Sequence, residues 1–322
     1  MASSIFTMDG KTVWVAGHKG LVGSALVRHL EGMPVKLLTV DRSEVDLRDQ
    51  RAVESWMTRQ RPQVVIVAAG TVGGIDANAR FPAKFLYDNI EIATNVIGAA
   101  HRARVEKLLF LGSTCVYPKL ADQPIKEDSL LTGPLEPTNQ WYAIAKIAGV
   151  KLAEAFRQEY CCDFISAMPT NLYGPNDNFD PETSHVLAAL LRKIHLAKAE
   201  GRATVQIWGT GAPRREFLHV DDLASACIFL LERYSDPLHI NVGTGADVTI
   251  RELAELIAEV VGFEGTFTFD KSKPDGTPRK CTDITRIRQL GWKPIIDLRS
   301  GLRQTYEGFV KQAHHFERRA YL

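Results

Sequence analysis

The sequence predicts an α/β protein, in which a doubly wound parallel sheet is joined to a second, smaller α/β domain. Three observations lead to this class. Short apolar runs of strand length alternate with longer stretches of helical period through the first half of the chain, a pattern typical of parallel sheets. A glycine-rich turn joins the first apolar run to the first helical stretch. The alternation becomes less regular after Pro175.

Composition limits the class of protein and its partners. The 322 residues provide enough chain for one large domain or two modest ones. Hydrophobic residues make up 45% and charged residues 24%, which is ordinary for a globular protein. The net charge of +1 gives no strong attraction to nucleic acid or to an anionic membrane, so we expect neither as a partner.

The apolar runs and the cysteines indicate a cellular location. Runs such as residues 64–69 are too short to span a bilayer, and residues 1–9 lack a basic region followed by an apolar one. The five cysteines are odd in number and none has the spacing of metal ligands, so we expect no metal site. A reducing cytoplasm is the simplest expectation.

The first strand, residues 12–16, leads into the turn Gly17-His18-Lys19-Gly20-Leu21-Val22-Gly23 and a helix over residues 24–30. Strand, glycine loop and helix form the context of a Rossmann-type dinucleotide site. Glycines let the backbone turn sharply and approach a pyrophosphate at the positive end of the helix. The alternative is a plain turn, but the flanking elements favour a cofactor loop.

The second strand, residues 35–40, is followed by Asp41 and Arg42. An Asp here usually bonds the adenosine ribose and selects NAD, whereas an Arg can hold the extra phosphate of NADP. This stretch alone is therefore ambiguous. Lys19 adds positive charge nearby and favours NADP.

The remaining elements of the first half continue the alternation. We expect helices at 51–59, 83–103 and 142–160 and strands at 64–69, 107–111 and 163–170. Ligands bind beyond the carboxyl ends of the strands in such sheets. Ser113 and Asn171 follow two of these ends, and are therefore candidates for the site.

The second half begins with a polar loop over residues 176–183. Helices are expected at 186–199, 222–233, 250–261 and 298–313, and strands at 205–208, 239–242 and 266–269. A loop rich in Lys, Pro and Gly runs through Lys280. This half resembles a smaller lid domain.

Tyr142 and Lys146 lie four residues apart on a predicted helix, so their side chains project from the same face. An ammonium near a phenol favours the phenolate and would lower the Tyr pKa from about 10 towards neutrality. Such a Tyr can exchange a proton with a hydroxyl or carbonyl. The same spacing also occurs by chance on solvated helices, so the pair alone is weak evidence.

Together, the glycine loop, Ser113, Tyr142 and Lys146 resemble the extended short-chain dehydrogenase/reductases. The resemblance is closer still to the GDP-L-fucose synthases, and it spans nearly the whole chain. The matching stretches are residues 72–75 (VGGI), 112–119 (GSTCVYPK), 142–149 (YAIAKIAG), 169–175 (PTNLYGP), 177–179 (DNF), 208–211 (WGTG), 215–222 (REFLHVDD), 240–245 (INVGTG) and 272–280 (SKPDGTPRK).

The resemblance implies a role for particular residues. The catalytic residues would be Ser113, Cys115, Tyr142, Lys146 and His185, of which Cys115 and His185 match the pair that exchanges protons beside the keto group. The GDP-sugar would be held by Lys193, Trp208, Arg215 and Asp275. The cofactor NADPH (NADP⁺) would be bound by Gly17, His18, Lys19, Gly20, Leu21, Val22, Gly23, Arg42, Leu47, Ala68, Ala69, Leu111, Gly112, Ser113, Lys146, Pro169, Thr170, Asn171, Leu172 and His185.

The resemblance also implies an activity, an assembly and a domain division. The activity would be NADPH-dependent 3,5-epimerisation and 4-reduction of GDP-4-keto-6-deoxy-D-mannose to GDP-L-fucose. A homodimer would form through the helices near 83–103 and 142–160. Residues 1–175 would form the NADP-binding Rossmann domain, which can regain a strand and helix from about 208–245, and residues 176–322 would mainly bind substrate.

Two departures and several alternatives stay open. Lys193 stands where the family pattern has Arg, and Lys lacks the planar fork that binds a phosphate with two bonds. Asp41 is unexpected for an NADPH enzyme.

A related GDP-deoxy-sugar epimerase/reductase, for a heptose or colitose precursor, is the first alternative. A 4,6-dehydratase is disfavoured because Thr114-Cys115 stands where those enzymes have an acidic pair, and a simple 4-epimerase has no need of Cys115 and His185. The last alternative is a non-catalytic dinucleotide sensor, which would typically lack Tyr142 and Lys146.

Overall fold

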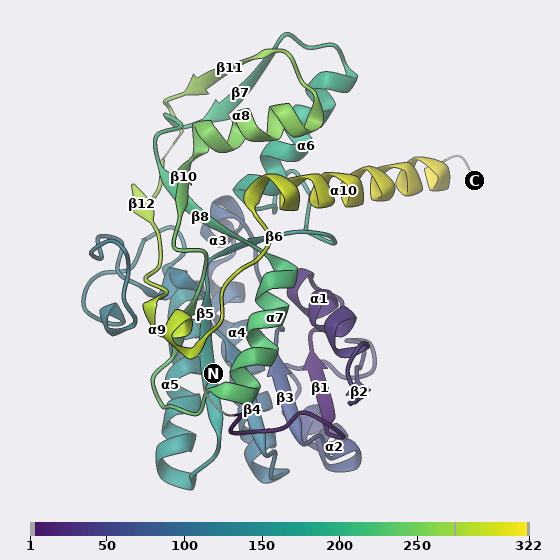
Figure 1. Cartoon of the computed structure of the whole chain (residues 1–322), viewed down its shortest axis with the longest axis vertical. Helices are drawn as coiled ribbons and strands as arrows, with labels where there is room; N and C mark the ends of the chain where they lie inside the picture. The colour runs from purple at the N-terminus through teal and green to yellow at the C-terminus, as the bar shows by residue number, and fades with distance from the viewer. Residues whose placement is uncertain (1–3, 274, 321–322) are drawn as a thin grey trace.

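The computed structural model describes residues 4–273 and 275–320. Its main feature is a six-stranded sheet in the order β2-β1-β3-β4-β5-β9, in which all neighbours are parallel (Figure 1). The strands are β1 (Thr12–Ala16), β2 (Lys36–Leu38), β3 (Val64–Val67), β4 (Lys107–Leu111), β5 (Phe164–Pro169) and β9 (Ile240–Val242).

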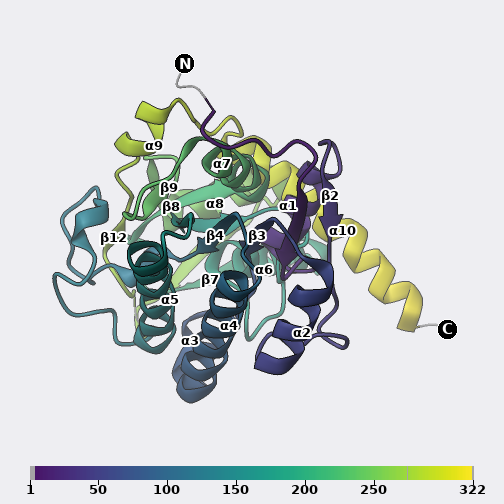
Figure 2. The ribbon, with the colours of Figure 1, turned by 90° about the horizontal axis from the view of Figure 1, so that it is seen from below.

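Helices cover both faces of this sheet, as Figure 2 shows. One face packs against α1 (Leu21–Leu30) and α7 (Val220–Arg233), and the other against α2 (Gln50–Gln60), α4 (Pro82–Arg102) and α5 (Gln140–Tyr160). The strand period of two divides the side chains between the two cores. In β1, Val13 and Val15 belong to the first core, and Trp14 and Ala16 to the second. Burial on both faces explains why these strands are apolar at every position.

A smaller unit lies at one end of the large sheet (Figure 1). It contains α6 (Val186–Ala199), α8 (Ile250–Val261), α10 (Leu298–Ala320) and a parallel pair of strands, β7 (Thr204–Trp208) and β11 (Thr266–Asp270). These elements share a third apolar core. A capping box fixes the start of α8, because Thr249 and Glu252 each bond the backbone N–H of the other.

A third sheet is centred on β8 (Arg214–His219). This strand pairs with β10 (Asp247–Thr249) in antiparallel fashion and with β12 (Arg279–Lys280) and β6 (Asn171–Tyr173) in parallel. Because β6 follows directly on β5, this sheet links the carboxyl edge of the large sheet to the smaller unit. The shorter elements are α3 (Ile75–Arg80), α9 (Thr285–Leu290), η1 (Thr114–Val116) and η2 (Glu127–Ser129).

The observed elements agree closely with the expected ones where the apolar pattern is strong. Strand β1 and helices α6 and α8 have the predicted bounds, and α10 continues seven residues beyond the expected end at residue 313. Helices α3 and α9 and strands β6, β8, β10 and β12 were not predicted. None of the described helices is long and apolar enough to cross a membrane.

Candidate active site

The glycine loop between β1 and α1 has no room for side chains at two positions. Gly17 has a φ of +92°, and a Cβ there would lie 2.7 Å from the Ala69 backbone. A Cβ on Gly23 would lie 2.0 Å from the carbonyl oxygen of Gly17. At Gly20, which precedes α1, no side chain caps the first backbone N–H groups of the helix. The loop therefore forms a tight cradle beside the positive end of a helix, the arrangement that binds a pyrophosphate.

Asp41, which usually selects NAD, lies next to this loop and is paired there with Lys19, which favours NADP. The Lys19 ammonium lies 2.7 Å from an Asp41 carboxylate oxygen, and His18 Nε2 lies 3.2 Å from the same oxygen. The hydrogen bond from Lys19 lowers the pKa of Asp41, so the carboxylate stays ionised and its charge is offset. The Arg42 side chain is 70% exposed, with Asp46 at 3.4 Å. Asp41 is thus already engaged, while Arg42 remains accessible to a further anion.

The other residues expected to hold a cofactor mostly lie along the carboxyl edge of the large sheet. Ala68 and Ala69 follow β3, Leu111 ends β4, and Gly112 follows it. Pro169 ends β5, and Thr170, Asn171 and Leu172 continue from it into β6. The Asn171 amide donates to the carbonyl of Glu216 at 2.8 Å, which fixes the turn between the two sheets. Leu47 lies ahead of α2, and its carbonyl accepts a bond from Asn95 at 3.0 Å.

Ser113 and Cys115 stand directly beyond the end of β4. The Ser113 hydroxyl accepts a hydrogen bond from the Cys115 backbone N–H at 3.4 Å and so caps the short helix η1. Cys115 is 7% exposed. The strand end and the helical turn thus place both side chains at the edge where ligands bind in such sheets.

Tyr142 and Lys146 project from α5 towards the same edge. The Lys146 ammonium donates to the carbonyl of Leu111, the last residue of β4, at 2.9 Å, and lies 5.7 Å from the centre of the Tyr142 ring. Burial lowers the pKa of Lys146 to about 8. The two side chains therefore lie near each other, and Lys146 contacts the end of β4.

The expected lowering of the Tyr142 pKa is wrong for this structure. Burial raises the pKa of the phenol, and the neighbouring Cys115 adds to that rise. The loss of solvation exceeds any attraction from Lys146, because the ammonium is bonded to the Leu111 carbonyl and not to the phenol oxygen. Tyr142 is thus held in its protonated form.

Cys115 also interacts electrostatically with Tyr142 and Lys146. Burial raises the pKa of the Cys115 thiol, and Lys280, Ser113 and Lys146 act in the opposite direction. Cys115 in turn influences the pKa of both Tyr142 and Lys146. The hydrogen bonds and the ring contact described above place Ser113, Cys115 and Lys146 at the end of β4, with the Tyr142 ring 5.7 Å from the Lys146 ammonium.

His185 belongs to the smaller unit. It occupies the position before α6, and its side chain is accessible, yet the surrounding protein lowers the pKa of the imidazole. The adjoining loop is tied to the large domain, since the Gly74 backbone N–H donates to the Thr183 carbonyl at 3.0 Å. A neutral imidazole that remains accessible can take part in proton exchange.

The residues expected to hold the GDP-sugar gather around the ends of β7 and β8. Trp208 is 59% exposed, and the ammonium groups of Lys193 and Lys273 lie 5.8 Å and 5.3 Å from the centre of its ring. Both Asp275 carboxylate oxygens accept bonds from Thr210, at 2.7 Å and 2.8 Å. Burial lowers the pKa of Arg215, and Asp275 opposes that shift, so the two charges lie near each other.

Two lysines near this group were not selected from the sequence as site residues. Lys273 lies beside Trp208, and Lys280 influences the pKa of Cys115. Both belong to residues 272–280, one of the stretches that carry the family resemblance. That stretch was the available signal, but local pattern gave no reason to choose either of its two lysines.

Comparisons with known proteins show the family of the chain. Residues 13–243 match the NAD dependent epimerase/dehydratase family. The chain is 56% identical over 314 residues to GDP-L-fucose synthase 1 of Arabidopsis thaliana, covering 97% of both chains. It is 53% identical over 319 residues to GDP-L-fucose synthase of Escherichia coli strain K12, covering 96% of this chain and 99% of that one. The solved structure of a GDP-L-fucose synthetase from Naegleria fowleri bound to NADP is similar, with a TM-score of 0.89 at 28% identity, covering 97% of this chain and 98% of that one.

Proposed function

The chain belongs to the NAD-dependent epimerase/dehydratase family, and on this premise we propose that it converts GDP-4-keto-6-deoxy-D-mannose to GDP-L-fucose by 3,5-epimerisation and NADPH-dependent 4-reduction. The observation that supports the proposal most directly is that Cys115 stands just beyond the end of β4, where Lys146 donates to the Leu111 carbonyl. Reduction alone needs only a proton donor for the ketone. An additional thiol in the same cluster suits a second proton transfer at a carbon.

The glycine loop supports NADPH as the cofactor. Side chains at Gly17 and Gly23 would fill the cradle, and the start of α1 offers backbone N–H groups to a pyrophosphate. Arg42 and Lys19 would hold the phosphate on the adenosine ribose, and Lys146 would hold the nicotinamide ribose. When bound, the nicotinamide supplies the hydride that carbon 4 of the sugar receives.

Epimerisation requires groups that move protons at the two carbons flanking the ketone. The ketone acidifies the protons on carbons 3 and 5, so a base can remove each one to give an enolate of the sugar. A proton then returns to the opposite face of the ring. Cys115 and His185 would perform these transfers, because a thiol gives up its proton far more readily than an aliphatic hydroxyl, and an imidazole can accept a proton and return it. Each well-placed group contributes typically 10²–10⁴-fold in rate.

Tyr142 would supply the proton in the reduction step. Its raised pKa keeps the phenol protonated, so it can donate to the ketone oxygen as the hydride reaches carbon 4. Ser113, beyond the end of β4, would hold the same oxygen by a hydrogen bond. Lys146 is fixed by the Leu111 carbonyl with its ammonium 5.7 Å from the centre of the Tyr142 ring, where its positive charge would stabilise the phenolate left by the transfer.

The group around Trp208 would bind the GDP portion of the substrate. The exposed indole offers a flat apolar face to a purine base, and Lys193, Lys273 and Arg215 supply positive charge for the two phosphates. Lys193 donates to the Gln206 carbonyl at 3.0 Å, which holds it near the ring. Asp275, in the segment between β11 and β12, would also contact the nucleotide.

Product identification tests the proposal directly. The protein is incubated with GDP-4-keto-6-deoxy-D-mannose and NADPH, and the sugar nucleotide is identified by NMR. We expect GDP-L-fucose with one NADPH oxidised per product. Turnover of only a GDP-heptose or colitose precursor would support the related epimerase/reductase instead. No oxidation of NADPH with any of these sugar nucleotides would indicate a non-catalytic sensor.

We propose a cytoplasmic location and a homodimer as the setting of this activity. All five cysteines are free thiols, which supports a reducing compartment. Helices α4 and α5 pack side by side, and they carry the exposed apolar side chains of Tyr87, Trp141 and Ile144. These side chains support an interface formed by the two helices.

A further inference from the structure

The glycine turn that follows β7 is joined to the segment that follows β11 by a pair of hydrogen bonds. Thr210 donates from its backbone N–H to one Asp275 carboxylate oxygen at 2.7 Å and from its hydroxyl to the other at 2.8 Å. The same hydroxyl accepts from the Ala212 backbone N–H at 3.2 Å, which leaves its single proton for Asp275. One residue therefore binds both oxygens of the carboxylate.

Gly209 leaves the space that this contact needs. Its φ of +78° already favours glycine, and a Cβ there would overlap the Asp275 carboxylate. The Gly209 backbone N–H donates to the carbonyl of Asp270, the last residue of β11, at 2.9 Å. Two successive residues of the turn, Gly209 and Thr210, thus bind the segment at its start and again at Asp275.

Lys273 lies between these two points, next to the exposed indole of Trp208. The segment begins with a tight turn, in which the Asp270 carboxylate accepts from the backbone N–H and the hydroxyl of Ser272, at 3.1 Å and 2.6 Å. The Asp270 carbonyl also accepts from the Lys273 backbone N–H at 3.2 Å. The Lys273 ammonium lies 5.3 Å from the centre of the Trp208 ring, and the Lys193 ammonium lies 5.8 Å from it. Two cations and an exposed aromatic ring therefore lie together at the end of β7.

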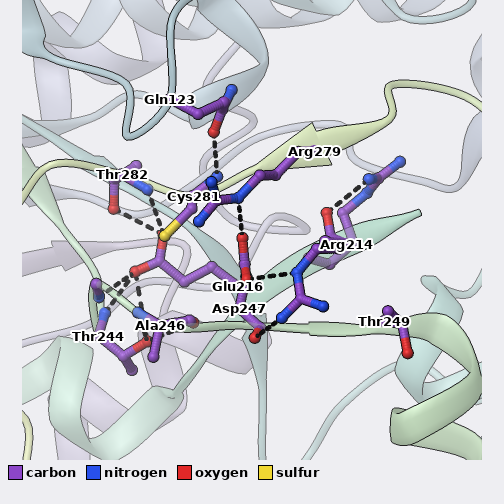
Figure 3. A network of polar contacts seen from close by, with 12 residues as sticks. Gln123, Arg214, Glu216, Thr244, Ala246, Asp247, Thr249, Arg279, Cys281 and Thr282 are labelled. Carbon is purple, nitrogen blue, oxygen red and sulfur yellow. Dashed lines mark hydrogen bonds and ion pairs between the residues drawn. The ribbon is translucent and has the colours of Figure 1, made fainter. Parts of the chain in front are cut away.

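The other end of the segment is anchored separately at β12, as Figure 3 shows. Arg279 donates to Asp247, which also accepts from Arg214 on β8. Thr282 then donates from its backbone N–H and its hydroxyl to one oxygen of the buried Glu216, at 2.8 Å and 2.7 Å. None of these bonds involves the turn after β7, so a change in that turn should leave β12 in place.

We propose that Thr210 is a positioning residue for the binding of a nucleoside diphosphate. It holds Asp275, and the ordered segment then keeps Lys273 beside Trp208 before the ligand arrives. The inference rests on the proposed function, in which this group of side chains binds the nucleotide portion of the substrate. A segment that is already ordered loses less conformational freedom when the ligand binds, so binding is tighter.

The affinity for GDP, measured by isothermal titration calorimetry of the full chain, tests this inference without turnover. Thr210→Val keeps the shape of the side chain and removes the hydroxyl bond, and Thr210→Ala is a second variant without that bond. Thr210→Ser keeps the hydroxyl and is the rescue variant. Thr268→Val is the matched control, since it makes the same change at an exposed threonine of β11. NADPH binding verifies that each variant is folded.

We expect the Kd for GDP to rise about fivefold to tenfold in Thr210→Val and in Thr210→Ala, because one of the two bonds to the carboxylate is lost. Thr210→Ser and Thr268→Val should stay within about twofold of the unaltered protein. With the sugar nucleotide as substrate, KM should rise by a similar factor while kcat stays within about twofold, since the turn takes no part in hydride or proton transfer.

A double-mutant cycle tests whether Thr210 acts through Asp275. Asp275→Ala removes the carboxylate, so the hydroxyl of Thr210 has lost its acceptor in that background. Adding Thr210→Val to Asp275→Ala should therefore raise the Kd for GDP by no more than about twofold further. Losses that multiply in the double variant would show that the two residues act independently and would contradict the inference.

Three further results would overturn the inference. An unchanged Kd for GDP in both Thr210→Val and Thr210→Ala would show that the hydroxyl bond does not affect binding. An equal loss in Thr210→Ser would assign the effect to packing, and no binding of GDP by the unaltered protein would refute the nucleotide site itself. Failure of the proposed reaction is read separately in the product test, and it would leave a shift in the Kd for GDP intact.

Discussion

Cys115 and Tyr142 act on different atoms of the sugar in the proposed reaction, so a single substitution should separate the two activities. Cys115→Ser conserves volume but replaces the thiol by a hydroxyl whose pKa lies far above neutrality. We expect proton exchange at carbons 3 and 5 to fall by about 10²–10⁴-fold while NADPH oxidation continues, because Tyr142 still donates its proton. The product should be an unepimerised GDP-6-deoxyhexose.

Deuterium incorporation from heavy water measures this separation. The unaltered protein should label carbons 3 and 5 of recovered sugar nucleotide, and Cys115→Ser should label neither. Tyr142→Phe is the converse control, since it should lose reduction and keep exchange. Full labelling by Cys115→Ser would remove Cys115 from the mechanism and leave it as a small buried side chain.

The choice of cofactor is also decided at single residues. Asp41 is engaged by Lys19 and His18, so it does not compete strongly for a ribose hydroxyl, whereas Arg42 is 70% exposed. Arg42→Ala should therefore lower kcat/KM for NADPH by about tenfold, the value of one charge-assisted bond of about 1.5 kcal/mol, and leave that for NADH nearly unchanged. Arg51→Ala, an exposed arginine on α2, is the control. Equal losses with both cofactors would show that Arg42 does not touch the phosphate.

At the scale of elements, the turn from β1 to α1 depends on close packing between loop and helix. Gly23→Ala would place a Cβ 2.0 Å from the Gly17 carbonyl oxygen, so the backbone of the loop must shift. We expect the Kd for NADPH, measured by fluorescence titration, to rise at least about tenfold, because the N–H groups that meet the pyrophosphate move with the loop. Gly32→Ala is the matched control, because a Cβ there would meet only the His29 carbonyl at 3.6 Å. Unchanged NADPH affinity in Gly23→Ala would contradict the assigned cofactor loop.

The elements also show where sequence pattern is informative and where it is not. Helix α8 was predicted with its observed bounds because its apolar stripe is regular and Thr249 and Glu252 mark its start. Strand β8 was not predicted, because Arg214, Arg215 and Glu216 are charged and read as a surface segment. The charges of Arg214 and Glu216 are bound by residues distant in sequence, Asp247 and Thr282. Strand β12 has two residues and no pattern of its own, so Lys280 could not be placed from sequence.

The same contrast applies to the candidate site. Ser113 and the Tyr142–Lys146 pair could be selected from strand ends and helical spacing, and Cys115 and His185 followed from the family resemblance. The electrostatics could not be predicted. Lys146 was expected to lower the pKa of Tyr142 because the two residues are neighbours on a helix. In the folded protein, burial raises that pKa, and the Lys146 ammonium is bonded to the Leu111 carbonyl. Burial arises from the whole packing around a residue and has no local signature.

At the scale of the whole molecule, the exposed apolar surface of α4 and α5 predicts a dimer. Tyr87 is 64% exposed, and Trp141 and Ile144 are each about 40% exposed on the adjoining helix. Pairing of these helices with a second copy would remove this surface from water, a gain of about 25 cal/mol for each Å² of apolar area buried. The helices also carry Tyr142 and Lys146, so a paired interface would stiffen the α5 segment that positions them.

Light scattering after size-exclusion chromatography measures the assembly. We expect the unaltered protein to have about twice the chain mass of 35.8 kDa at micromolar concentration. Tyr87→Arg should dissociate it, because an unpaired charge in an apolar interface costs several kcal/mol. Ile295→Arg, which alters a side chain that is 82% exposed and far from both helices in sequence, should leave the mass unchanged.

A monomeric mass for the unaltered protein would refute the dimer. A dimer that survives Tyr87→Arg but dissociates in Ile295→Arg would place the interface elsewhere. Because α5 contributes residues to the site, loss of the dimer by Tyr87→Arg should also lower kcat, whereas an interface remote from α5 would leave kcat unchanged.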